Sequence, residues 1–316
     1  MKAKNIKAVL RKKFEHFLNN IPDEKVRAVV KRDGIITGGS IASMLLGETV
    51  NDFDIYLKTL QGVRLVADHY VERFKANPPT RFKNDPSKQV DISILEVEDL
   101  RLPEKIRVKL VVKSAGIASE EGSGDYEYFE GSTDPTAAER FVESANSVAK
   151  DKEEDGKPKY RPVFLSSNAI SLSDDIQIVT RFYGPIEEIH KNYDFVHCTC
   201  SWDAETGELR LPPAALEAML AKDLRYQSSR YPLCSIIRTR KFLHRGWRIT
   251  AGQYLKMAWD LNQLKLSDPD VLEDQLVGVD SAYFIQVVEL LRMEMKKTGA
   301  TEIDGAYLME VVDSIF

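Results

Sequence analysis

Cysteine, long apolar runs and an excess of basic charge are all scarce in this sequence of 316 residues. The three cysteines offer no disulfide framework and fit a reducing compartment. No apolar run approaches the roughly 20 residues that a membrane-spanning helix needs. A net charge of −5 argues against a protein that coats nucleic acid through a generally basic surface, although local basic faces stay open. We therefore expect a cytoplasmic protein without a membrane partner, whose oligomeric state the sequence leaves unknown.

The hydrophobic spacing divides the chain into a mixed α/β head, residues 1–211, and a helical domain, residues 212–316. Residues 4–18 have helical spacing and lack the apolar core of a signal peptide. Glycine, serine and acidic residues dominate 115–160, which we interpret as an insertion. Further helices are predicted at 22–31, 40–47, 62–77 and 185–192; strands are predicted at 34–37, 52–57, 89–95, 106–114, 162–172, 175–184 and 195–202, with a hairpin at 203–211.

The most informative stretch is GIITGGSIASMLLGETVNDFDIYL, residues 34–57. Gly38 and Gly39 precede a short helix, so bare backbone N–H groups can face a phosphate there, and Ser40 adds a hydroxyl donor. Asp52 and Asp54 are two apart on a predicted strand, so both carboxylates point to the same face. Mg²⁺ prefers one or two carboxylates together with phosphate oxygens and water. A glycine–serine turn alone is more often flexible, and two such acids alone are more often solvated, but their combination predicts a site for a metal-bound triphosphate.

This block resembles the DNA polymerase β-like nucleotidyltransferase superfamily, and most of all the heads of tRNA CCA-adding enzymes and bacterial poly(A) polymerases. Their GG-[AST]…LLG…D-[IF]-D block matches residues 38–54. YDFVHCTCSWDAETGELRLPP, residues 193–213, is similar to the RDFT-x-NA strand and hairpin of that family. YPLCSIIRTRKFLHRG, residues 231–246, is similar to its DPLR-x-LRA-x-RF helix. Tyr193 and Tyr231 stand where the family has an arginine and an acid that help to select CTP and ATP.

The resemblance implies a nucleotidyltransferase head with a mixed, mostly antiparallel sheet, followed by helices. It implies transfer of a nucleoside monophosphate from an NTP such as ATP to an acceptor hydroxyl, with release of pyrophosphate. Two Mg²⁺ ions, with Mn²⁺ as an alternative, would be held by Asp52 and Asp54 about 3.5–4 Å apart. The first expected acceptor is an RNA 3′ end, and the second is a protein or small molecule, as in toxin-like or antibiotic-modifying enzymes.

A third carboxylate is expected on a neighbouring strand of such a head. Asp194 is our first choice because its flanking sequence carries the resemblance, and Asp91 is the alternative. Alignment with the family would instead place Gln177 at this position, where it is a poor metal ligand. Asp194 could also be a structural strand residue, leaving two true ligands.

A basic run at 222–248 contains tyrosines and a tryptophan. The run fits either a solvated helix face or a platform for nucleotide and RNA, and the resemblance favours nucleotide binding for Arg238 and Arg240. His197, Cys198 and Cys200 lack partners for a tetrahedral zinc site in the sequence, so core packing is expected for them.

Overall fold

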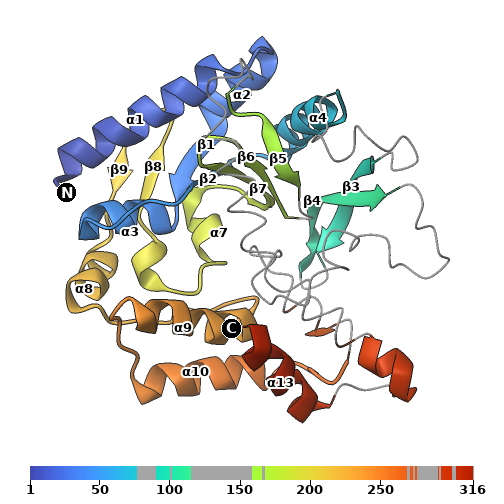
Figure 1. Cartoon of the computed structure of the whole chain (residues 1–316). Coiled ribbons are helices and arrows are strands. Elements are labelled where there is room, and N and C mark those ends of the chain that lie inside the picture. Colours follow the sequence, from blue (N-terminus) through green and yellow to red (C-terminus); the bar gives the residue numbers. More distant parts are fainter. Residues whose placement is uncertain are drawn as a thin grey trace.

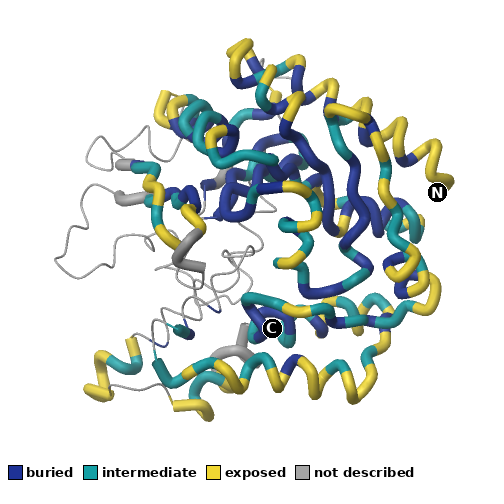
Figure 2. The backbone as a smooth tube through the Cα atoms, turned by 180° about the vertical axis from the view of Figure 1, so that it is seen from behind, coloured by how far each residue is buried: buried dark blue, intermediate teal, exposed yellow. Residues whose placement is uncertain are grey.

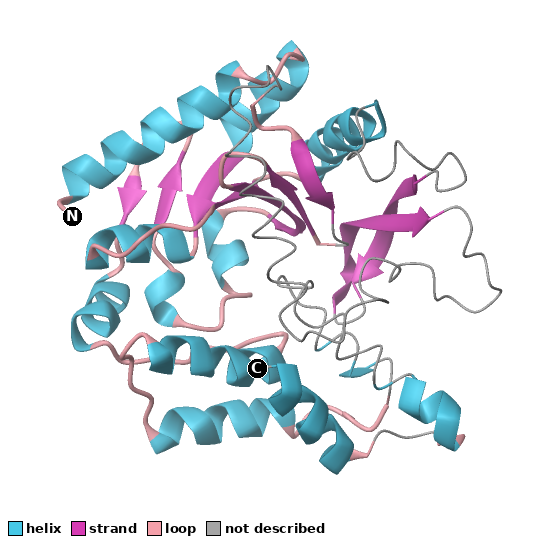
Figure 3. Ribbon diagram, viewed as in Figure 1, coloured by secondary structure: helices cyan, strands magenta, loops and turns pink. Residues whose placement is uncertain are grey.

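The computed structural model describes residues 1–76, 90–99, 102–114, 159–165 and 168–268, with short pieces of the C-terminal region to 315. Its centre is a seven-stranded sheet in the order β5-β6-β7-β2-β1-β8-β9, in which only β2 and β7 pair in parallel. The mixed, mostly antiparallel sheet and its flanking helices confirm the expected fold class (Figure 3). The strands of this sheet are β1 (Gly34–Thr37), β2 (Phe53–Leu57), β5 (Pro162–Leu165), β6 (Ala169–Leu172), β7 (Ile176–Tyr183), β8 (Ser201–Asp203) and β9 (Leu209–Arg210).

A separate hairpin, β3 (Val90–Asp99) with β4 (Leu102–Ser114), forms a second sheet of two strands. Strands were expected at both places. The predicted insertion at 115–160 lies outside the described residues except for its last two.

The centre of the fold is the unit β1–α3–β2. All four residues of β1 are buried, and the sequence GIIT suits this position because it has no charged side chain. Helix α3 (Gly39–Leu46) ends at Gly47, which adopts the left-handed conformation (φ 75°). The backbone N–H of Glu48 then donates to the carbonyl of Ser43, a helix-ending pattern in which glycine is favoured. The chain returns through β2, which pairs antiparallel with β1. The short α3 is thereby fixed beside the start of β2.

Helices cover both the edge and the faces of this sheet (Figure 1). The head contains α1 (Ala3–Asn19), α2 (Glu24–Asp33), α4 (Leu60–Ala76) and α7 (Ile186–His190). Asp23 caps α2, because its carboxylate accepts hydrogen bonds from the backbone N–H groups of Lys25 and Val26. Buried residues concentrate in the strands and on the helix faces turned toward them (Figure 2).

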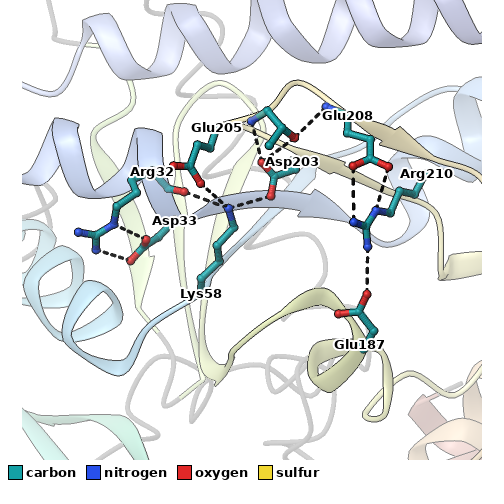
Figure 4. Close-up of polar contacts among 9 residues, drawn as sticks. Arg32, Asp33, Lys58, Glu187, Asp203, Glu205, Glu208 and Arg210 are labelled. Atoms are coloured by element: carbon teal, nitrogen blue, oxygen red, sulfur yellow. Dashed lines mark hydrogen bonds and ion pairs between the residues drawn. The ribbon is translucent and has the colours of Figure 1, made fainter.

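An ion-pair network joins the C-terminal ends of β2 and β8 (Figure 4). Lys58 Nζ lies 2.8 Å from a carboxylate oxygen of Asp203 and 3.1 Å from one of Glu205. Burial opposes the charge on Lys58, but these two hydrogen bonds outweigh it and raise the Lys58 pKa. This end of the sheet is the end opposite Asp54, because Gly34 and Leu57 pair there while Thr37 and Asp54 pair at the other.

From Pro213 onward the named elements are all helices: α8 (Pro213–Ala221), α9 (Pro232–His244), α10 (Ala251–Leu261) and α13 (Gly305–Ile315). Figure 1 shows α9 and α10 as a layer across from the sheet. One apolar core continues from the sheet into this region and includes Met219, Trp247 and Met257. The division of the chain at residue 211 into two domains stays a prediction. None of the described helices combines the length and apolar character that crossing a membrane demands.

The expected strand at 195–202 was wrong over most of its length. The structure has a single turn of 3₁₀ helix, η2 (Val196–Cys198), before the short β8. Local hydrogen bonds replace the sheet ladder here: the Thr199 hydroxyl and N–H both donate to the carbonyl of Val196. An alternating apolar pattern is therefore overridden by a side chain that bonds to its own turn.

Candidate active site

A cavity of about 240 Å³ lies where the N-terminus of α3, the start of β2 and the C-terminal half of α9 meet. It brings together residues from five segments of the chain between Gly38 and Trp247. Among the predicted site residues, those that line it are Gly38, Gly39, Asp52, Asp54, Asp194 and Arg238. The cavity therefore joins the glycine turn, the paired aspartates and the basic helix in one place.

Gly38 brings the backbone of the turn against the carboxylate of Asp54. A Cβ atom at this position would lie 3.0 Å from Asp54 Oδ2 and 3.6 Å from the Tyr193 hydroxyl. Its backbone dihedrals, φ 95° and ψ −153°, fall in a region that only glycine enters without strain. Both the conformation and the close approach therefore require glycine here. At Gly39 an added Cβ would meet no atom within 4 Å, which leaves open space beside the first turn of α3.

The two aspartates occupy different backbone positions. Asp54 is within β2, where it pairs with Thr37 of β1 and with Gln177 of β7. Asp52 is exposed and directly precedes β2. Both line the same cavity, although the strand expected at 52–57 begins only at Phe53, so Asp52 reaches the cavity from the loop before it.

Ser40 lies beside this site without forming its surface. The residues of α3 that line the cavity are Gly39, Ala42, Ser43 and Leu46, which share one helical face. Ser40 is buried with 6% of its surface exposed, and its hydroxyl has no hydrogen-bond partner in the described part of the chain. Ser43, which the sequence reading did not single out, faces the cavity instead.

Asp194 and Arg238 pair with each other. Arg238 Nη1 lies 2.9 Å from Asp194 Oδ2, and Asp194 Oδ1 accepts from the backbone N–H of Phe195 at 2.9 Å. The two alternatives for the third polar ligand differ in position. Gln177 lies next to Asp54 in the sheet and lines the cavity, whereas Asp91 belongs to β3 in the separate hairpin, and its side chain lies outside the described residues.

Helix α9 presents one basic face to the cavity. Arg238, Lys241 and Arg245, at helical spacing, line it, while Arg240 is exposed and is not among the lining residues. Arg245 also forms an ion pair with Glu48, just beyond the end of α3. Lys241, Arg245 and Arg240 all belong to the basic run of the sequence. Their angular positions around the helix decide that Lys241 and Arg245 face the cavity and that Arg240 does not.

Burial sets the protonation of several groups around the cavity. Burial lowers the pKa of His197 to about 4, more strongly than the nearby Asp194 raises it, so the imidazole is neutral at pH 7. Burial, together with Tyr56 and Asp54, raises the pKa of Tyr193 well above its usual value. Burial also raises the pKa of Cys198 and Cys200, which keeps both thiols protonated. Cys200 is buried, as expected for a packing residue, whereas Cys198, which is half-buried, and His197 also line the cavity.

A magnesium ion is compatible with this donor set. In the described part of the chain, no group of three or more His, Cys, Asp or Glu side chains is arranged to hold a metal. Two aspartates in one cavity nevertheless supply the hard oxygen ligands that Mg²⁺ takes from a protein when substrate phosphates and water complete its shell. Asp52 and Asp54 are therefore the residues that would hold it.

Comparisons with known proteins connect the chain to one family. A model described as "Gabija anti-defense 2 family protein" matches residues 8–222. A curated relative from Bacillus phage SPbetaL7, described as Gabija anti-defense 2, is 22% identical over 144 residues, which cover 43% of this chain and 36% of the relative. The match thus spans about a third of that relative's length.

Solved structures of CCA-adding enzymes also align with the chain. The Bacillus stearothermophilus CCA-adding enzyme in complex with CTP is 14% identical, with a TM-score of 0.38, and the alignment covers 89% of this chain and 52% of that enzyme. The Thermotoga maritima CCA-adding enzyme complexed with tRNA is 11% identical, with a TM-score of 0.36 and coverage of 90% and 53%.

Proposed function

The chain belongs to the Gabija anti-defense 2 family, and we propose that it is a template-independent nucleotidyltransferase that moves a nucleoside monophosphate from an NTP to an acceptor hydroxyl. One observation carries this proposal: the carboxylate of Asp54 lies against the bare backbone of Gly38, at the N-terminus of α3, in a cavity that Asp52 also lines. A helix N-terminus attracts phosphate, and two aspartates suit Mg²⁺ with phosphate ligands.

The chemistry requires in-line displacement at the α-phosphorus. The acceptor oxygen forms a bond to phosphorus while the bond to the bridging oxygen breaks, and pyrophosphate leaves with that electron pair. Mg²⁺ held by Asp52 and Asp54 would neutralise charge on the triphosphate. The N–H groups at Gly39 and Ser40 would orient the phosphates, and Asp194 is the candidate acceptor of the hydroxyl proton. Catalysis is then mainly positioning and charge neutralisation.

Two acceptors fit this donor site. An RNA 3′ end was expected first, and the basic residues of α9 support it. Outside α9, however, two arginines of the basic run at 222–248 are paired with acidic side chains: Arg225 with Glu217 at 3.0 Å, and Arg248 with Asp223 at 3.0 Å. The family description names a role against the Gabija defence system. These two observations favour the second candidate, a hydroxyl group on a protein of that system.

The test is incubation of the protein with each α-labelled NTP and Mg²⁺, together with total RNA or a lysate containing the Gabija system, followed by gel analysis. Label on RNA supports the first acceptor and label on a protein supports the second. The matched control is the double variant Asp52→Asn/Asp54→Asn, which must transfer no label. Pyrophosphate release that survives in this variant overturns the proposed function.

A further inference from the structure

A row of polar residues crosses the central sheet at the level of Asp54. Gln177 of β7 pairs with Asp54 on one side and with Ser171 of β6 on the other. Thr37 of β1 continues the row on the far side of Asp54. Residues that pair directly across neighbouring strands point to the same face of the sheet. Gln177 and Asp54 both line the cavity, so the sheet presents an amide and a carboxylate side by side there.

The amide of Gln177 is open to the cavity. The residue is half-buried, and its side chain makes no hydrogen bond to any other residue that the structure describes. Thr37, in the same row, differs because its hydroxyl donates to the carbonyl of Cys200 at 2.8 Å. The fold therefore uses the Thr37 side chain for its own hydrogen bonds and leaves that of Gln177 to face whatever the cavity holds.

Asp52 and Asp54 are the carboxylates that the cavity offers to a metal. Asp194 also lines the cavity, but Arg238 balances its charge at 2.9 Å, and its other oxygen accepts from the N–H of Phe195. Over the described ranges, no three His, Cys, Asp or Glu side chains form a cluster that could hold an ion. The donor set beside the glycine turn is therefore two carboxylates with one neutral amide next to them.

The charge of this donor set suits one Mg²⁺ ion. Mg²⁺ is usually bound through one or two carboxylates together with substrate phosphates and water. Two such ions at the spacing of two-metal centres, about 3.5–4 Å, repel each other about four times as strongly as two single charges at that distance. A second ion therefore needs a further negative ligand, and the amide of Gln177 carries no charge.

We propose that the centre holds a single Mg²⁺, bound by Asp52, Asp54 and the triphosphate, and that Gln177 limits it to one ion by placing a neutral amide beside Asp54. This inference rests on the proposed function, since it assumes a nucleoside triphosphate in the cavity. It differs from the expectation of two Mg²⁺ ions, and it gives Gln177 a role that the sequence left open. With one ion at the triphosphate, the proton of the acceptor hydroxyl goes to a side chain, for which Asp194 is the candidate.

The test counts metal ions by electron paramagnetic resonance of Mn²⁺, which replaces Mg²⁺ and has a signal of its own. The protein is saturated with the α,β-methylene analogue of each NTP in turn, so that no transfer occurs. Two Mn²⁺ ions about 3.5–4 Å apart couple magnetically and give a spectrum unlike that of a single ion. The wild type should bind one Mn²⁺ per complex of protein and analogue and show the uncoupled spectrum. A coupled pair in the wild type overturns this inference alone, and a wild type that binds none of the analogues with Mn²⁺ overturns the proposed function as well.

Gln177→Glu adds a carboxylate beside Asp54, so it should bind a second Mn²⁺ at least about tenfold more tightly than the wild type and show the coupled spectrum. Ser171→Glu is the matched control, because it adds the same charge one strand further from Asp54 and should keep one ion. A Gln177→Glu protein that folds in a thermal melt and still binds one ion overturns the role of Gln177. If Gln177→Glu does not fold, the wild-type count and Gln177→Ala decide the matter. Gln177→Ala should keep the single ion, and loss of that ion would make Gln177 a ligand and overturn the inference.

Discussion

The two walls of the cavity are built by different means. On the sheet side, backbone fixes the site: Gly38 packs against Asp54, and Asp54 is held in register with Thr37 and Gln177. On the side of α9, long side chains form the surface, and ion pairs such as Arg238 with Asp194 hold them. Backbone geometry tolerates little adjustment, whereas long charged side chains change rotamer at small cost.

This difference assigns different tasks to the two walls. A reaction that depends on positioned phosphate and metal needs the rigid wall. Selection of a nucleotide or an acceptor can reside in the exposed part of the adjustable wall, at residues such as Lys241, where substitutions cost little stability. Loss of an aspartate or of Gly38 on the sheet side should therefore act mainly on the rate, and loss of a cation on the helical side mainly on binding.

The largest effect should follow the loss of a carboxylate from the sheet wall. Asp54→Asn, or Asp52→Asn, should reduce pyrophosphate release by on the order of 10³-fold, because the charge that balances the metal and triphosphate is lost. Asp203→Asn is the matched control: it removes a strand carboxylate that pairs with Lys58 at the other end of the sheet. The control should retain its rate and melt at a lower temperature. Equal losses of rate in both variants would contradict the assignment of the site.

The glycine turn allows a sharper test with two neighbouring residues. Gly38→Ala places a Cβ 3.0 Å from Asp54 Oδ2 in a backbone conformation restricted to glycine, so we expect about 1–3 kcal/mol of destabilisation and about 10²-fold lower activity. Gly39→Ala meets no atom within 4 Å, so its stability should be unchanged or slightly raised. Its NTP affinity should fall instead, because the methyl group stands where phosphate approaches. Thermal melts and nucleotide titrations measure the two effects, and a stable, active Gly38→Ala would refute the rigid wall.

The ion pair between Asp194 and Arg238 decides the role of the third acid. If Asp194 receives the hydroxyl proton, Asp194→Asn should lower the rate by about 10²-fold with little change in KM. Arg238→Gln should then cost about tenfold and mainly raise KM. If the two residues only hold each other, both single variants and the double variant should lose activity equally. A double-mutant cycle with pyrophosphate release as readout separates these outcomes.

The sheet wall of the cavity could be predicted from the sequence because the residues that form it are close together in the chain. The apolar strand, the glycines and the paired aspartates are all within residues 34–57, and each has one dominant conformational reason. In the structure, Gly38, Gly39, Asp52 and Asp54 all line one cavity. Of the site residues predicted in this stretch, Ser40 does not reach the cavity surface. The face of α3 that lines the cavity contains Gly39, Ala42 and Ser43 and passes Ser40 by.

The residues of the helical wall were harder to predict from the sequence, because their positions depend on helix phase and on long-range packing. Arg238 and Arg240 have the same charge and are two residues apart, but they fall on different sides of α9. The position of His197 depends on the 3₁₀ turn that replaced the expected strand. Its packing against Trp247, 50 residues away in sequence, could not be inferred from spacing.

The pH dependence of stability should report on the helical wall. The His197 pKa is about 4 in the folded protein and about 6.5 when unfolded. The stabilisation by neutral His197 is therefore complete above pH 6.5 and is lost as the pH falls toward 4, since only the unfolded chain takes up the proton in that window. We expect a loss of on the order of 2–3 kcal/mol across it. Denaturant unfolding at several pH values should show a shallower decline in His197→Phe than in the wild type, and equal slopes would contradict this account.

The smallest effects should come from two neighbouring cations of α9, one that lines the cavity and one that lies outside it. Lys241→Ala removes a cation that lines the cavity, so we expect NTP affinity to fall by roughly five- to tenfold, with little change in stability. Arg240→Ala removes the neighbouring cation from an exposed position outside the lining, so we expect a change below about twofold. Because both substitutions remove one positive charge from the same helix, a general effect of net charge would make them equal. A larger loss in Arg240→Ala would instead extend the binding surface over the exposed face of α9, which is where an acceptor rather than the nucleotide would lie.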